Sequence, residues 1–167
     1  MDEYKYKVVF EYDLNKHVEV MYDANKKGRK ASFIGLVGVI LLLVSAIINE
    51  GDSTGYIILA IMFLFFSLLF LYSTSKKNYK KTLLTNKAYI GSIFTYEFYD
   101  EYVNIIKTGG YYESKGTMYY PYIVEAVAIN DSLGYLKAKD SGVIFLCGDE
   151  VKDIVNFINE KISYYKK

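Results

Sequence analysis

The sequence predicts a membrane-spanning α-helical hairpin joined to an α+β domain, in which an antiparallel barrel or sheet is closed by a C-terminal helix. Three observations predict it. Two uncharged apolar runs occupy residues 31–48 and 55–72, and basic clusters flank the pair. Short β-like runs separated by turn residues fill residues 92–147. An amphipathic helical pattern follows them and completes the chain.

The two apolar runs have the length of membrane spans. Each has 18 residues and no charge. As a helix, each would measure about 27 Å, close to the ~30 Å hydrocarbon core of a bilayer. Because neither run contains Asp, Glu, Lys, Arg or His, no ion path or proton relay is predicted, which argues against a transporter or pump.

Basic residues lie just before the first span and just after the second, whereas the connection at residues 49–54 carries Glu50, Asp52 and no base. The positive-inside rule therefore predicts a multi-pass protein of the cell membrane, with both termini cytoplasmic and the connection outside. The same basic residues are candidates for contact with anionic lipid. The alternative is that they only set the topology. They are Lys26, Lys27, Arg29, Lys30, Lys76, Lys77, Lys80 and Lys81.

Small residues fall on roughly one side of the first span, at Ser32, Gly35, Gly38 and Ser45. Small residues let helix backbones approach closely in a membrane. Two interpretations stay open, namely packing against the second span of the same chain and contact with another copy.

Residues 1–30 are predicted to form a cytoplasmic arm. Its Tyr/Lys alternation at residues 4–10 indicates a half-buried strand, and Asp13 is placed to cap a helix that runs through Val18 and Tyr22. His17, the only histidine, is expected to be a surface or packed residue rather than a metal ligand. Residues 73–87 are expected to form a basic juxtamembrane linker.

Residues 88–167 are predicted to form the cytoplasmic domain. Strands are expected at residues 92–99, 102–106, 118–120, 123–129, 135–138 and 143–147, with turns at residues 108–110, 114–116, 130–134 and 139–142. Asp149 is expected to cap the last helix, whose apolar face must lie on the sheet. This face consists of Val151, Ile154, Val155, Ile158 and Ile162. The plan is that of a pleckstrin-homology-like barrel.

The composition of the chain argues against several classes of function. The chain has 20 basic and 19 acidic residues, so bulk charge does not indicate nucleic-acid binding. Cys147 is the only cysteine and lies in an apolar strand-like run, where a buried small residue is expected. Asp100 and Glu101 are adjacent, so a strand would point them to opposite faces. We therefore expect no catalytic residues, no metal site and no cofactor.

The chain resembles the YcxB-like family of bacterial membrane proteins. The resemblance rests on the paired spans with Lys-rich flanks, on residues 94–103 and 119–125, and on the strand at residues 143–146. It implies two spans and a pleckstrin-homology-like cytoplasmic domain, but no catalytic residue. The expected function is a non-enzymatic, membrane-anchored interaction or regulatory module that contacts membrane lipid, a protein partner or another copy. The alternative is an envelope self-protection protein of the immunity or stress-resistance type.

Overall fold

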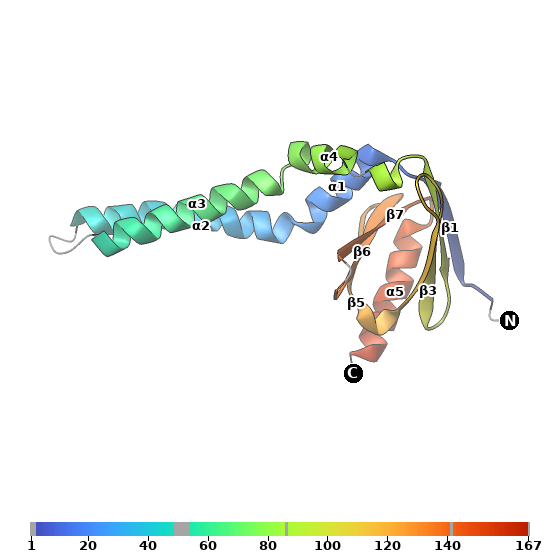
Figure 1. Ribbon diagram of the computed structural model, residues 1–167. Helices are drawn as coiled ribbons and strands as arrows, with labels where there is room; N and C mark the ends of the chain where they lie inside the picture. The colour runs from blue at the N-terminus through green and yellow to red at the C-terminus, as the bar shows by residue number, and fades with distance from the viewer. Residues whose placement is uncertain (1–2, 49–53, 86, 141, 167) are drawn as a thin grey trace.

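The computed structural model describes residues 3–48, 54–85, 87–140 and 142–166. Two long helices form a hairpin (Figure 1). Shorter helices join it to a head, which consists of the strands and the last helix. Apart from Thr54, the predicted connection at residues 49–54 lies outside the described residues.

The hairpin consists of α2 (Lys26–Ile48) and α3 (Thr54–Ser73), which contain the two predicted spans. Both helices are long and apolar enough to cross a membrane. Only 6% and 11% of their most apolar stretches are buried, unlike the core helix of a soluble protein. The apolar side chains of both helices therefore face outward and are exposed.

Small residues set the contact between the two helices of the hairpin. A Cβ added at Gly35 would lie 2.8 Å from the Oγ of Ser67, so the backbones approach closely there. Val39, Ala60 and Ser67 are buried along the same contact. Among the described residues, a Cβ at Gly38 would meet nothing within 4 Å. Packing against the second span thus accounts for Gly35 but not for Gly38.

The head contains two antiparallel sheets in the described residues. The first has the order β1-β2-β3-β4 and comprises β1 (Tyr6–Glu11), β2 (Ser92–Phe98), β3 (Tyr102–Gly109) and β4 (Ser114–Tyr119). The second comprises β5 (Ile123–Asn130), β6 (Leu133–Ala138) and β7 (Gly142–Cys147). The predicted arm strand pairs along β2, so the arm and the tail share one sheet.

The segment between β3 and β4 differs from the prediction. Residues 114–116 were expected to form a turn but are the first half of β4, which pairs with β3 from Ser114 opposite Lys107. The physical reason is that Gly109 and Gly110, with φ of 72° and 68°, already reverse the chain. The first sheet then ends at a 3-10 turn, η2 (Tyr120–Tyr122), where Pro121 has no N–H to offer a ladder.

The last helix, α5 (Val151–Tyr165), packs into the head as predicted. Its five predicted apolar residues are all buried, and they share one core with both sheets (Figure 1). The predicted cap was wrong, because the N-cap residue is Glu150 rather than Asp149. The Glu150 side chain makes no capping hydrogen bond. Burial of the apolar face therefore stabilises this helix more than its cap does.

Shorter helices join the hairpin to the head. In α1 (Leu14–Ala24), the Asp13 side chain accepts hydrogen bonds from the backbone of Asn15 and Lys16, which confirms the predicted cap. The segment predicted as a linker is largely helical. It contains α4 (Lys76–Thr85), and a short 3-10 turn, η1 (Lys87–Tyr89), begins at its last residue. The Ser75 hydroxyl accepts from the backbone N–H of Asn78 at 3.3 Å and so caps α4.

Candidate functional site: a basic helical neck

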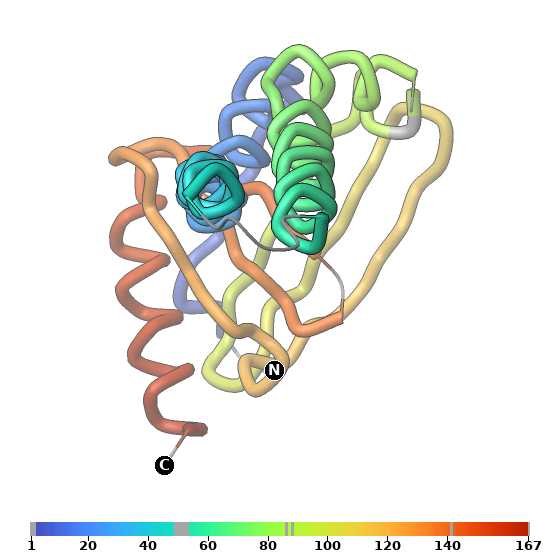
Figure 2. The backbone as a smooth tube through the Cα atoms, turned by 90° about the vertical axis from the view of Figure 1, so that its left-hand side faces the viewer, coloured from blue at the N-terminus to red at the C-terminus, as the bar shows by residue number. Residues whose placement is uncertain are grey.

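The predicted basic residues gather where the hairpin meets the head. We call this region the neck and define it as α1, residues 26–30 of α2, and α4. Helices α1 and α4 pack side by side, and the neck continues directly into both helices of the hairpin (Figure 1). Figure 2 looks along the hairpin toward the head, with α2 and α3 nearly end-on. The two clusters, which are 46 residues apart in sequence between Lys30 and Lys76, thus belong to one region.

Helix α4 has one face toward the protein and another toward solvent. Tyr79 and Leu83 are half-buried and one turn apart. At about 100° per residue, the four lysines of α4 fall within an arc of about 140° that excludes these two residues. Burial raises the pKa of Tyr79, although nearby Arg29 opposes this shift, so the phenol stays neutral. The lysines therefore carry the charge of this helix.

Tyr22 lies between the two basic clusters. The guanidinium carbon of Arg29 is 3.4 Å from the centroid of its ring, and the Nζ of Lys76 is 5.1 Å from the same centroid. Arg29 also donates a hydrogen bond to the carbonyl oxygen of Tyr22. Each such cation–π contact contributes about 0.5–1 kcal/mol at an exposed site. One aromatic ring thus holds the start of α2 close to the start of α4.

Two further bases contact protein groups. Lys27 forms an ion pair with Glu125 of β5 at 3.2 Å, and its own side chain is 90% exposed. Lys80 donates to the side-chain oxygen of Asn15 at 3.4 Å. Exposed pairs of this kind contribute about 0–1 kcal/mol, so they orient the neck on the head without fixing it.

The remaining four bases have no such contact. Lys26, Lys30, Lys77 and Lys81 are exposed, and within the described ranges their side chains form no hydrogen bond, ion pair or cation–π contact. The predicted set of eight therefore divides into bases that contact the protein and bases that are free to bind an external anion. The sequence did not reveal Tyr22 as the aromatic contact that Arg29 and Lys76 share. The available signal was its position seven residues, or two helical turns, before Arg29.

The lone histidine and the lone cysteine are packed residues, as expected. The His17 ring stacks on Phe145 at 5.4 Å, and its Nδ1 lies 3.1 Å from the Tyr12 hydroxyl. Burial lowers the pKa of His17 to about 4. Cys147 is 7% exposed, and its Sγ lies 3.2 Å from the Nζ of Lys16.

Comparisons of this chain with protein-family models, with curated proteins and with solved structures find no match. The resemblance to the YcxB-like family and the pleckstrin-homology-like assignment therefore stay predictions.

Proposed function

We propose that this chain is a non-enzymatic, membrane-anchored interaction module. In this proposal the hairpin of α2 and α3 crosses the cell membrane, and the head lies at its cytoplasmic face. The neck contacts anionic lipid headgroups and so holds the head at the membrane surface. The two sheets and α5 form the pleckstrin-homology-like domain that presents a binding surface to a partner.

The observation that carries this proposal is the position of the free bases. Lys26 and Lys30 flank the start of the first apolar span, and Lys77 and Lys81 follow the end of the second. All four are at the end of the hairpin that joins the head (Figure 1). A lysine near an anionic bilayer surface contributes about 1 kcal/mol to the attraction. Four such residues at one level would give a clear preference for anionic over zwitterionic lipid.

The internal contacts of the neck support the same proposal. The Tyr22 contacts hold the two clusters together, and the Lys27–Glu125 pair connects them to β5. A head that is joined to the membrane only through a flexible linker would have no defined orientation. Here α1 and α4 continue into the hairpin, so lipid contact at the neck would also orient the head.

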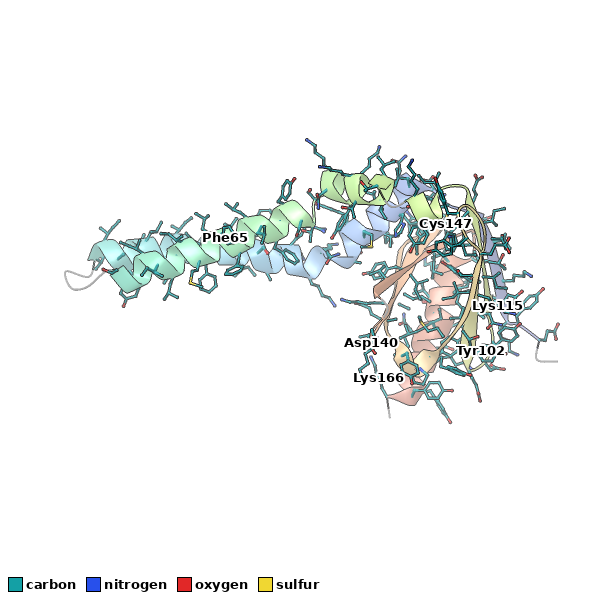
Figure 3. The ribbon with its side chains drawn as sticks, viewed as in Figure 1. Phe65, Tyr102, Lys115, Asp140, Cys147 and Lys166 are labelled. Atoms are coloured by element: carbon teal, nitrogen blue, oxygen red, sulfur yellow. The ribbon has the colours of Figure 1, made fainter. Side chains whose placement is uncertain are left out.

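The experiment measures lipid selectivity in the full chain. The protein is reconstituted in nanodiscs of mixed phosphatidylglycerol and phosphatidylcholine, and spin-labelled lipids report which headgroup is enriched at the protein. The variant Lys77→Gln/Lys81→Gln removes two free bases of the neck. The control Lys5→Gln/Lys115→Gln removes two exposed bases of the head. Figure 3 shows Lys115 on the side of the head away from the hairpin.

We expect the wild-type protein and the control to enrich phosphatidylglycerol, and the neck variant to lose most of this enrichment. We also expect added salt to reduce the enrichment, because exposed charges are screened beyond about 8–10 Å at physiological ionic strength. Equal enrichment in the neck variant and the wild-type protein would reject the lipid contact and would mean that these bases act only in setting topology.

A further inference from the structure

The head contains an aromatic pocket that none of the basic residues of the neck lines. Its volume is about 190 Å³, and it lies between the inner faces of the two sheets. Its walls include Tyr12, His17, Tyr89, Phe94 and Phe145. Phe94 belongs to the first sheet and Phe145 to the second, so the pocket is located where two separate sheets of the described structure face one another. Tyr89 of η1 contributes a further wall.

Two polar side chains of these walls, His17 and Tyr12, are neutral at physiological pH. The His17 Nδ1 and the Tyr12 hydroxyl contact each other at 3.1 Å. Burial lowers the pKa of His17 to about 4 and raises the pKa of Tyr12 to about 12. The pocket therefore offers an apolar, aromatic surface with one neutral hydrogen-bonding pair.

Lys107 places a positive charge beside this pocket. It lies on the inner face of β3, two residues after the pocket residue Ile105, and is only 3% exposed. Its Nζ lies 3.5 Å from the centroid of the Tyr112 ring and 5.6 Å from the centroid of the Tyr89 ring. Within the described part of the chain, this Nζ is buried and makes no hydrogen bond.

A buried ammonium without an acceptor is costly, and aromatic faces replace only part of the lost hydration. In proteins, a buried ammonium is usually stabilised by an anionic group that accepts hydrogen bonds from it. Tyr112, which covers the ammonium, is 52% exposed and follows the two glycines that reverse the chain. The exposed position of Tyr112 gives an incoming anion a route to Lys107.

The size of the pocket limits the body of such a ligand. A dry cavity of about 150 Å³ in another protein accommodates benzene. A volume of about 190 Å³ therefore suits a body of one aromatic ring or a short aliphatic chain. We propose that the head binds a small monocarboxylate, with its apolar body among the aromatic residues and its carboxylate on the ammonium of Lys107, displacing the Tyr112 ring. The site shares His17 of α1 with the neck but none of the eight predicted basic residues, so the two proposals are tested independently.

The experiment uses benzoate as the probe and the full chain in detergent micelles. His17 is the only histidine, so selective ¹³C labelling of its imidazole gives a single NMR signal from the wall of the pocket. The variant Lys107→Met keeps an unbranched side chain and removes the charge. Lys115→Met makes the same change at an exposed position of β4. Benzamide serves as the neutral analogue of the probe.

We expect benzoate to shift the His17 signal saturably in the wild-type protein and in Lys115→Met. A charge-assisted hydrogen bond implies that Lys107→Met binds benzoate about 10- to 100-fold more weakly. The wild-type protein should discriminate against benzamide to a similar extent, which tests the role of charge even if Lys107→Met fails to fold. Absence of a saturable shift up to about 10 mM benzoate, or equal binding of benzoate and benzamide, would overturn the proposal and leave Lys107 as a lysine packed between tyrosines.

Discussion

Acidification should destabilise the head through His17. The ring of His17 lies against Phe145 and contacts Tyr12, and this burial lowers its pKa from the ordinary value of 6.5 to about 4. In the unfolded chain the same imidazole returns to its ordinary pKa. Between pH 6.5 and pH 4 the unfolded chain therefore binds a proton that the folded protein does not.

The sign and the size of the effect follow from proton linkage. Because the unfolded state binds more protons in this range, stability rises with pH. The contribution of His17 is fully present above about pH 6.5 and is lost as the pH falls toward 4. At about 1.36 kcal/mol for each pKa unit, a pKa lowered from 6.5 to about 4 contributes at most about 3–4 kcal/mol.

Two measurements test this prediction. The single histidine signal of the full chain in micelles should titrate near pH 4. The pH dependence of the melting temperature, followed by near-ultraviolet circular dichroism of the tyrosines, should be shallower in His17→Phe between pH 4 and 6.5. Phenylalanine keeps a ring on Phe145 but has no proton to bind. A histidine signal that titrates between pH 6 and 7, or equal pH dependence in both proteins, would refute the reasoning.

Two further predictions concern packing in the head. Ile154 is fully buried, so Ile154→Ala should lower the stability by about 2–5 kcal/mol, whereas Asn156→Ala on the exposed face of α5 should change it by less than about 0.5 kcal/mol. Equal melting temperatures would mean that α5 does not pack on the sheets. A Cβ at Gly134 would lie 2.6 Å from the carbonyl oxygen of Val127, so Gly134→Ala should cost about 1–3 kcal/mol. Gly116→Ala, whose Cβ would meet nothing within 4 Å, should melt close to the wild-type protein, and equal losses in both variants would contradict this steric account.

Periodicity predicted the elements that are defined by burial of one face. The apolar residues of α5 recur at helical spacing, and all five are buried. The strand of the arm was also predicted, although its pairing with β2 follows from tertiary contacts that a local pattern does not contain. The helical state of α4 was missed because four lysines in ten residues gave no apolar periodicity. The Ser75 cap and the packing of α4 on α1 stabilise this helix although its sequence has no apolar periodicity.

The candidate sites were predictable to different extents. The basic residues of the neck are visible in the sequence because lysine clusters beside apolar spans form a local pattern. Their contacts with Tyr22 and Glu125 depend on chain segments that meet only after folding. Lys107 was missed because its strand was expected to end at Ile106. In the structure β3 continues through Lys107 and places this lysine on the inner face of the sheet. Lysine is almost never fully buried, so nothing in the sequence indicated that it would lie there.

In the proposed topology the hairpin crosses the cell membrane, and the neck and the head lie on the cytoplasmic side. Reporter fusions in living cells test this topology most directly, with a reporter that is active only in the cytosol placed after Lys167 in one fusion and at Asp52 in another. We expect activity for the fusion after Lys167 and none for the fusion at Asp52, because eight bases flank the spans and the connection has none. Activity at Asp52 and none after Lys167 would reverse the orientation and contradict the proposed contact of the neck with the inner leaflet.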